Sequence, residues 1–335
     1  MLTELKKNLL NDGVVIPAHP LALTEERKLD EETQAGLTRY YINAGAGGVA
    51  VGVHTTQFAI REKGMLKPVL KIARDTAQEM GRSDDFLLIS GACGDADQVE
   101  REAELAAELG YDACLISPGG TQNLSEAQLI KRAERAAKHI PLFGFYLQPA
   151  VGGRYLSFDF WKDFGAIDNV AAVKFAPFDR YFTLEAARGL CASGRVEDIA
   201  FYTGNDDNIV IDLLTKYRIE MNGKIYEKQI VGGLLGHWAV FTEGAVKMLN
   251  MIKECRKKDV IPAEMFTLAA QVTDMNAAVF DPKNGFKGCI AGVHYILQKY
   301  GIMKNILCLD ENETVSPGQA EEIERICREY PQWAK

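Results

Sequence analysis

The stretch DACLISPGGTQNLSEAQLIKRAERAAKHIPLFGFYLQ, residues 112–148, holds two short apolar runs separated by one helix-forming segment. Ser125 and Gln128 have the spacing of a capping box, in which each side chain accepts a hydrogen bond from a backbone N–H of the first turn. This pattern predicts a helix from Ala127 to His139. The flanking runs are almost wholly apolar, as expected of strands buried on both faces of a parallel sheet. The stretch therefore predicts a strand–helix–strand unit.

The same unit recurs along most of the chain. Eight apolar runs follow one another at intervals of 26 to 38 residues, and each gap is predicted to hold one amphipathic helix. Eight strand–helix repeats within about 240 residues favour a (β/α)8 TIM barrel over an open sheet. No Gly-x-Gly-x-x-Gly motif follows the first run and no Walker loop occurs, which argues against a dinucleotide-binding or P-loop fold. The predicted strands start near Gly13, Gly48, Phe86, Asp112, Pro141, Val170, Ile199 and Gln229.

The pattern changes after Asp259, where three helical stretches follow near residues 263–280, 287–300 and 317–330. We therefore expect residues 1–258 to form the barrel with a short N-terminal helix. Residues 259–335 are expected to form a C-terminal helical extension packed on the barrel.

Composition narrows the class of protein. The 335 residues include 38 Lys and Arg against 46 Asp and Glu, so the formal net charge is −8. This charge provides no basic surface for nucleic acid or for anionic lipid, so neither is an expected partner. No apolar run approaches the roughly 18 residues that a membrane helix needs. Seven scattered cysteines without a Cys-x-x-Cys pair, and a start that lacks the pattern of a signal peptide, lead us to expect a reduced, cytoplasmic protein.

The candidate active site is sought at the carboxyl ends of the strands, where barrel enzymes place it. Lys174 ends the sixth predicted strand among apolar residues. Burial of a lysine is costly unless the amine is paired or neutral, and desolvation lowers its pKa from about 10.4. A neutral amine inside a barrel can form a Schiff base with a ketone. The alternatives are that Lys174 extends to the rim or forms a salt bridge with Asp179.

Three other strand ends carry polar groups. Tyr146 ends the fifth strand and is expected to flank Lys174 and relay a proton, although an aromatic at the edge of the core is the simpler reading. Thr55 and Thr56 end the second strand, where their hydroxyls and backbone N–H groups could hold a carboxylate, but such pairs are also common in turns. Gly204 and Asn205, after the seventh strand, belong either to a loop or to the site.

Together these motifs resemble the dihydrodipicolinate synthase / N-acetylneuraminate lyase family of class I aldolases. The likeness runs from about Gly13 to Glu243 and rests on the order and spacing of the motifs. The similar segments are DGVVIPAHPL (12–21), NAGAGGVAVGVHTTQ (43–57), Phe145–Pro149, AAVKFAPFD (171–179), Tyr202–Asp206 and Gly233–Gly236.

This resemblance implies a lyase, aldolase or dehydratase that acts on a small 2-keto acid such as pyruvate. It implies that Lys174 forms an imine with the keto acid, that Tyr146 relays protons, and that Thr55 and Thr56 bind the carboxylate. The covalent imine on Lys174 is then the electron sink, with no other cofactor and no metal. The resemblance also implies a homo-oligomer, either a tetramer built from dimers or a dimer.

The chain departs from the family pattern at four places. His54 replaces a glycine and Gln57-Phe58 replace Gly-Glu, while Ser117–Gly120 lacks the aromatic tyrosine of the synthase relay. Arg154 lies a few residues later than the arginine that binds the second substrate in the synthases, and His237-Trp238 replace small residues. We therefore expect the lysine and tyrosine to be kept, and the partner substrate to differ from the aldehyde of the synthases.

Three of the five histidines, His19, His54 and His237, end the first, second and eighth strands, which are neighbours once a barrel closes. They could be acid–base groups or substrate contacts, ligands of a divalent metal, or unrelated loop residues. With Arg154, Gly204 and Asn205, they are candidate substrate-binding residues. Two rival functions therefore stay open: a metal-assisted barrel aldolase or hydrolase that uses these histidines, and a metabolite-binding barrel without turnover.

Overall fold

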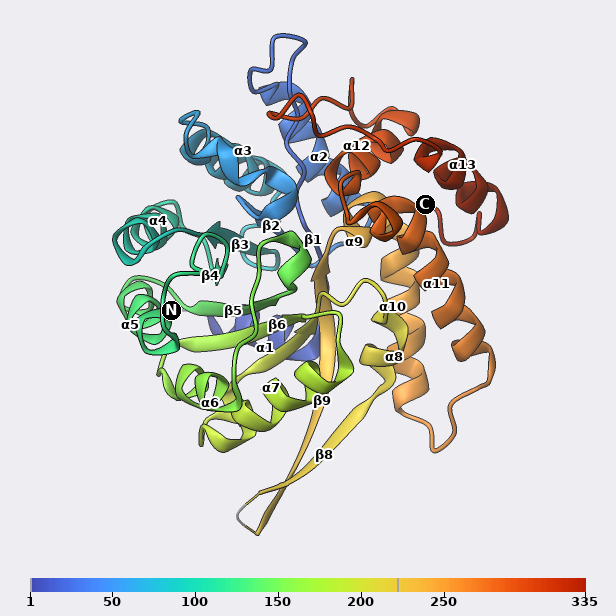
Figure 1. The fold of residues 1–335 in the computed structure, drawn as a ribbon. Helices are drawn as coiled ribbons and strands as arrows, with labels where there is room; N and C mark the ends of the chain where they lie inside the picture. Colours follow the sequence, from blue (N-terminus) through green and yellow to red (C-terminus); the bar gives the residue numbers. More distant parts are fainter. Residues whose placement is uncertain (1, 222) are drawn as a thin grey trace.

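The structure is a computed structural model that describes residues 2–221 and 223–335. Eight parallel strands form a ring surrounded by helices (Figure 1). A parallel bridge between Ala18 and Ala50 closes the ring, supported by a hydrogen bond of 2.8 Å from the His19 N–H to the Ala50 carbonyl. The predicted (β/α)8 barrel is confirmed. The strands follow the order β1 (Val15–Pro17), β9 (Lys224–Leu235), β7 (Ala200–Thr203), β6 (Val170–Ala176), β5 (Leu142–Leu147), β4 (Ala113–Ile116), β3 (Leu87–Ala92) and β2 (Gly48–Val51).

The strands are apolar because they are covered on both faces. Successive side chains of a strand point to opposite faces, so each strand contributes to two cores. On β6, Ala172 and Ala176 belong to the core inside the barrel, whereas Val173 and Phe175 belong to the core between the sheet and the helices. Lys174 therefore shares the inward face of β6.

The outer layer follows the predicted alternation. The capping box of Ser125 and Gln128 is present, and the helix that it opens begins one residue earlier than predicted. The helix α1 (Glu4–Asp12) covers the amino end of the barrel, where the Tyr202 hydroxyl donates a 2.8 Å hydrogen bond to the Leu10 carbonyl. The other helices of this layer are α2 (Glu31–Asn43), α3 (Leu66–Glu79), α4 (Ala96–Glu108), α5 (Glu126–Ala137), α6 (Phe158–Ala166), α7 (Arg180–Ala192), α8 (Ile209–Leu214) and α10 (Thr242–Arg256).

One gap differs from the prediction of a single amphipathic helix. Between β7 and β9 the helix α8 has only 6 residues, and the chain continues into β8 (Lys216–Met221), which pairs antiparallel with the first half of β9. This hairpin projects from the barrel (Figure 1). Residues 216–221 alternate polar and apolar side chains, which is typical of a half-exposed strand. The positive φ of 75° at Gly223 suits the turn.

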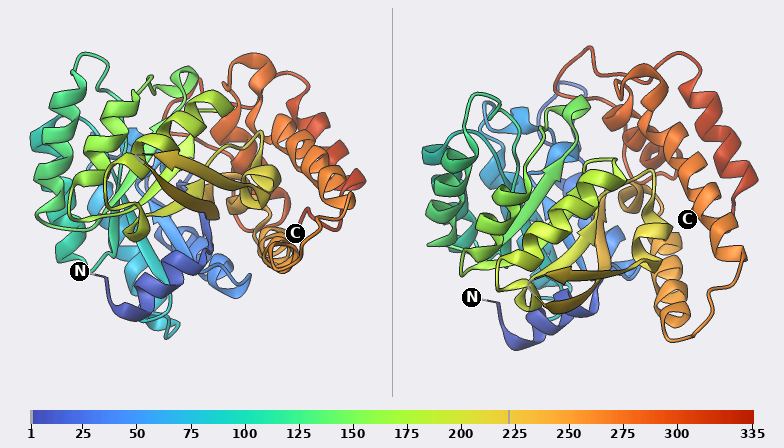
Figure 2. Two further views of the ribbon diagram at one scale, coloured as in Figure 1. Left: turned by 90° about the horizontal axis from the view of Figure 1, so that it is seen from below. Right: turned by 60° about the horizontal axis from the view of Figure 1, so that its bottom comes forward.

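The three predicted C-terminal helices are confirmed as α11 (Glu264–Phe280), α12 (Cys289–Lys299) and α13 (Gln319–Glu329). They lie as a layer on one side of the barrel (Figure 2), with α11 against α8 and α12 against α9 (His237–Val240). The division of the chain at residue 258 stays a prediction. Among the described residues, no helix combines the length and apolar character that crossing a bilayer requires. Within the described residues the 3-10 helices are η1 (His54–Thr56), η2 (Phe58–Ile60), η3 (Pro149–Val151), η4 (Val196–Asp198) and η5 (Pro282–Asn284).

Candidate active site

A cavity of about 70 Å³ lies at the carboxyl end of the barrel, between the strand ends and the connection from α11 to α12. Its polar lining includes Lys174 of β6, Asp206 after β7, and His54 and Thr55 of η1. This is the end of the barrel at which the sequence predicts the site. The apolar lining comes from Ala18, Val53, Phe145, Leu147, Val151, Ala176, Phe178, Leu235, Phe280 and Phe286.

Lys174 lies in this cavity and is only 9% exposed. Its Nζ atom is 4.3 Å from the centre of the Phe145 ring. Burial lowers the pKa of Lys174 to about 8, against the opposing effect of the negative charge of Asp206. At such a pKa roughly one amine in ten is neutral at pH 7, whereas an exposed lysine is almost wholly charged. The alternative salt bridge to Asp179 is wrong, because that carboxylate caps α7 by accepting a 3.0 Å hydrogen bond from the Phe182 N–H.

Gly204 provides the space for the Lys174 side chain. A Cβ atom at position 204 would lie 2.2 Å from Cε of Lys174, far inside van der Waals contact. The Gly204 N–H donates a 2.7 Å hydrogen bond to the Phe175 carbonyl, so the backbone here is held close to β6. Gly204 therefore fixes where the amine lies, and its contact with the substrate stays a prediction.

Replacing Gly204 by Ala is expected to displace the Lys174 amine and to slow its reaction with a ketone by about ten- to a hundredfold, as misplacements near 1 Å do. The rate of borohydride-trapped adduct formation with pyruvate measures this. The matched control is Gly36→Ala, because a Cβ at Gly36 meets nothing within 4 Å. Equal rates in both variants would show that Gly204 does not position the lysine.

Tyr146 does not face the cavity, so the prediction that it flanks Lys174 there is wrong. Its hydroxyl is 3.4 Å from the Leu156 N–H, and its ring packs 5.3 Å from that of Trp161 in α6. The residue in register with Lys174 on the neighbouring strand is Phe145. Because neighbouring residues of a strand alternate between its faces, only one of Phe145 and Tyr146 can point inward. The inward ring carries no hydroxyl and cannot relay a proton.

Asp206 is the acid–base candidate that the sequence analysis passed over. Its Oδ1 atom is buried and has no hydrogen-bond partner among the described residues. Burial raises the pKa of Asp206 to about 7, although the positive charge of Lys174 opposes this shift. A carboxyl that titrates near neutrality can donate and accept a proton under the same conditions. The sequence could have indicated Asp206, because this carboxylate lies only two residues beyond Gly204 in the loop that follows a barrel strand.

His237 lies behind Asp206 rather than in the cavity, so its predicted substrate contact is wrong. Burial lowers the pKa of His237 to about 4, and its Nδ1 is 2.6 Å from Oδ1 of Asn276 in α11. The Asn276 amide donates a 2.6 Å hydrogen bond to the Asp206 carbonyl. The neutral imidazole therefore orients Asn276, and Asn276 holds the loop that carries Asp206.

His19 is also wrong as a substrate contact. It is fully buried against α2, where its ring nitrogens lie 2.9 Å from the Thr38 hydroxyl and 2.8 Å from the Pro20 carbonyl. Of the three histidines, only His54 lines the cavity, and burial lowers its pKa to about 4. The expected convergence of His19, His54 and His237 does not occur. Among the described residues, no three His, Cys, Asp or Glu side chains are grouped to hold a metal ion.

Thr55 and Thr56 have different roles in the structure. Thr55 lines the cavity, and its hydroxyl donates a 3.2 Å hydrogen bond to the His19 carbonyl. The hydroxyl of Thr56 donates to the same carbonyl at 2.6 Å and accepts from the Gly52 N–H at 3.0 Å, so it holds the turn. Only Thr55 is placed to meet a ligand through its side chain.

Asn205 and Arg154 serve the framework, so their predicted substrate contacts are wrong. Asn205 is fully buried and accepts a 3.0 Å hydrogen bond from the Phe178 N–H. The guanidinium of Arg154 donates to the carbonyls of Thr121 (3.1 Å) and Leu124 (2.5 Å), and it does not line the cavity. The Asn205 oxygen and Nη1 of Arg154 are thus engaged by the protein itself.

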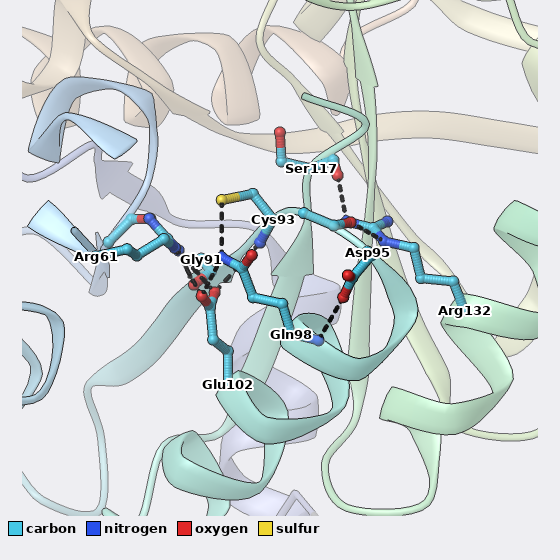
Figure 3. Close-up of polar contacts among 10 residues, drawn as sticks. Arg61, Gly91, Cys93, Asp95, Gln98, Glu102, Ser117 and Arg132 are labelled. Carbon is cyan, nitrogen blue, oxygen red and sulfur yellow. Dashed lines mark hydrogen bonds and ion pairs between the residues drawn. The ribbon is translucent and has the colours of Figure 1, made fainter. Parts of the chain in front are cut away.

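A second polar cluster lies beside the ends of β3 and β4 (Figure 3). Arg61 and Glu102, each with a 9% exposed side chain, form an ion pair with 2.8 Å between Nε and Oε1. Arg61 also donates to the Gly52 and Gly91 carbonyls, at 3.1 and 2.9 Å. This buried pair joins η2 to α4 and neutralises its own charge, which indicates a structural role.

No family model matches the sequence, and no curated protein matches it. Solved structures, in contrast, match almost the whole chain. Dihydrodipicolinate synthase from Oceanobacillus iheyensis superimposes with a TM-score of 0.77 and 14% identity, over 98% of this chain and 99% of that chain. N-acetylneuraminate lyase from Fusobacterium nucleatum complexed with pyruvate gives 0.73 and 15%, over 97% and 99%.

A third structure, CdNal from Clostridium difficile in complex with mannosamine, gives a TM-score of 0.75 and 16% identity, over 95% of this chain and 99% of that chain. At such identities the likeness speaks for the fold. The chain therefore has the fold of the dihydrodipicolinate synthase / N-acetylneuraminate lyase family that its motifs resemble.

Proposed function

We propose that this protein is a Schiff-base-forming lyase that acts on a small 2-keto acid such as pyruvate. The observation that carries the proposal is the buried Lys174 amine, whose pKa is lowered by burial and which lies in the strand-end cavity with Asp206. The shared fold supports it, because structures with that fold include pyruvate complexes.

In the first step, the lone pair of the neutral Lys174 amine attacks the keto carbon and forms a C–N bond. The electron pair of the C=O bond moves to oxygen, which takes up one of the two protons of the attacking nitrogen, so that a neutral carbinolamine results. Asp206, protonated near neutral pH, then gives its proton to the departing hydroxyl, so that water leaves and the nitrogen carries the positive charge of an iminium ion.

In the second step, the iminium withdraws electrons from the neighbouring carbon. When C3 loses a proton to the Asp206 carboxylate, or when a C3–C4 bond breaks, the electron pair moves to nitrogen and gives an enamine. The imine on Lys174 is thus the electron sink, and the scheme needs no separate cofactor. We assign the keto-acid carboxylate to Thr55 and His54, the neutral hydrogen-bonding groups beside Lys174.

The rival functions differ in what they require. A metal-assisted mechanism through His19, His54 and His237 needs side chains that the fold places apart, since only His54 lines the cavity. A barrel that binds a metabolite without turnover would bind pyruvate and leave the amine unmodified. Chemical trapping therefore separates the Schiff-base lyase from both.

The test is borohydride reduction in the presence of pyruvate, followed by mass spectrometry of the intact protein and its peptides. The expected result is one adduct per chain at Lys174, with a mass gain equal to pyruvic acid less one oxygen atom. Lys174→Arg should give no adduct. Lys228, whose pKa burial also lowers, is the internal control and should stay unmodified. Absence of the Lys174 adduct would refute the proposal.

A further inference from the structure

We infer that Asn276 and His237 are positioning residues of the reaction, because together they hold Asp206 in the cavity from outside the barrel. This inference rests on the proposed Schiff-base function and explains how its acid–base group is kept in place. It comes from the hydrogen bonds that helix α11 makes to residues 204–208, the β7 loop, which joins β7 to α8.

The Asp206 carboxyl lies where it needs support. Its Oδ1 atom is buried and has no hydrogen-bond partner among the described residues. Burial of such an oxygen costs free energy, which the side chain would recover by turning out into water. The surface is close, because the neighbouring Asp207 side chain is 41% exposed and pairs with Arg180 there. A bond to the backbone of Asp206 opposes this turn.

Helix α11 holds the β7 loop at two successive carbonyls. The Asn276 amide donates a 2.6 Å hydrogen bond to the Asp206 carbonyl, and the Thr273 hydroxyl donates a 2.8 Å bond to the Asp207 carbonyl. Residues three apart lie on the same face of a helix, so one face of α11 reaches both. Thr273 is exposed, and water can replace its bond, whereas Asn276 is buried. Asn276 is therefore the main anchor.

His237 determines which way the Asn276 amide points. Burial lowers the pKa of His237 to about 4, so its ring is neutral at pH 7 and carries one N–H. Its Nδ1 lies 2.6 Å from Oδ1 of Asn276, whereas its Nε2 is buried without a partner among the described residues. With the proton on Nδ1, the ring donates to Oδ1, and the amide N–H then faces the Asp206 carbonyl.

Each of the other three arrangements brings two acceptors together. A proton on Nε2 of His237 would leave the lone pair of Nδ1 facing Oδ1 of Asn276. Turning the amide over would place Oδ1 against the Asp206 carbonyl with either tautomer. Contacts between acceptors in the interior leave buried polar groups unsatisfied, which is costly. Of the four combinations of tautomer and amide direction, the one that satisfies both contacts is the one that anchors Asp206.

The anchor matters because the position of Asp206 sets its affinity for a proton. Burial raises the pKa of Asp206 to about 7, against the opposing charge of Lys174 on β6, and the charge of Asp207 raises it further. The Cys289 thiol of α12 also faces this carboxyl, and burial raises its own pKa. In a released loop Asp206 would reach water, and its pKa would fall toward that of an exposed aspartate. It would then be ionised at pH 7 and could not give a proton to the departing hydroxyl.

Asn276→Leu tests the anchor, since leucine has nearly the size of asparagine and cannot donate. The measurement is the exchange of pyruvate methyl hydrogens for deuterium, followed by NMR with the full-length protein. We expect exchange to slow by about ten- to a hundredfold. The limb of its pH profile that falls with rising pH should move at least about one unit lower. Borohydride trapping should still reach one adduct per chain at Lys174. A role in packing alone would leave the limb in place.

Two variants of His237 form a matched pair. His237→Asn keeps an N–H donor on the atom bonded to Cγ, as Nδ1 is, whereas His237→Leu has nearly the same size and shape without a donor. We expect exchange in His237→Asn to be at least about tenfold faster than in His237→Leu. Equal rates would overturn the inference, and this comparison stands even where Asn276→Leu fails to fold.

The outcomes separate this inference from the proposed function. An unmoved limb in Asn276→Leu, with trapping intact, overturns the inference and leaves the Schiff-base lyase standing. Trapping without exchange in the unaltered protein also overturns the inference alone. Absence of a trapped adduct in the unaltered protein overturns both.

Discussion

Asp206→Asn is expected to lower turnover by about 10²–10⁴-fold, and to form the reducible imine with pyruvate more slowly but to the same final extent. The amide keeps the shape of the side chain but can no longer give or take a proton in the elimination of water or in the loss of the C3 proton. Turnover is measured as aldol product, and proton removal as exchange of the pyruvate methyl hydrogens for deuterium by NMR. Both rates should fall together.

The pH dependence distinguishes proton transfer from a structural role. In the native protein the attacking amine must be neutral, which is favoured as pH rises through about 8, while Asp206 must be protonated, which is lost as pH rises through about 7. A bell-shaped profile between these limits is expected, and its two limbs belong to the coupled pair. Asp206→Asn should remove the limb that falls with rising pH. It should also lower the pKa of Lys174 further, because the Asp206 charge raises it.

The matched control for this variant is Asp85→Asn. The Asp85 side chain is 55% exposed and pairs with Arg82 at 2.7 Å at the surface, away from the cavity. Its replacement should leave turnover and the pH profile unchanged. Native turnover in Asp206→Asn would show that this carboxyl takes no part in the chemistry.

Glu102→Gln is expected to lower the free energy of unfolding by about 3–5 kcal/mol, the usual cost of leaving one member of a buried ion pair without its partner. Glu102 accepts hydrogen bonds from Nε and Nη2 of Arg61 at 2.8 and 2.9 Å and from the Gln98 amide at 2.9 Å. The neutral amide fills the same space and leaves the Arg61 charge buried. Urea unfolding, followed by circular dichroism, measures the change.

Two comparisons make this prediction specific. Glu79→Gln breaks an exposed pair with Arg39, whose side chains are 65% and 46% exposed, and should cost less than about 1 kcal/mol. The double variant with Arg61→Met and Glu102→Leu removes both charges and should recover much of the loss, since apolar residues often replace buried pairs without cost. A small effect of Glu102→Gln would mean that water reaches Arg61.

The fold could be predicted because its signals are local in sequence. Apolar runs at regular intervals, one capping box and a change of pattern after Asp259 placed the eight barrel strands and the three C-terminal helices. The β8–β9 hairpin was missed because a helix was expected in every gap by repetition. Polar and apolar side chains alternate in residues 216–221, and this two-residue period indicates a strand where the repeat predicted a helix.

The site was predicted less well. Lys174 could be identified because the sequence alone shows a charged residue inside an apolar run. The assignment of Tyr146 failed because the motif match places it at the end of β5 without showing which face of the strand it occupies. Phe143, Phe145 and Leu147 belong to the core inside the barrel, so the alternation along the strand turns Tyr146 toward the helices.

Sequence by itself therefore determined the barrel, the end of the barrel that holds the cavity, and the lysine within it. Tertiary structure alone decided that Phe145 rather than Tyr146 faces that lysine and that Asp206 shares its cavity. It also decided that the three histidines contact different parts of the protein instead of meeting at one site. The physical reason is that strands, helices and buried positions leave a local pattern of apolar and polar residues in the sequence. The direction of one side chain, and the pKa that its surroundings give it, arise only when distant segments such as α11 and the end of β7 come together.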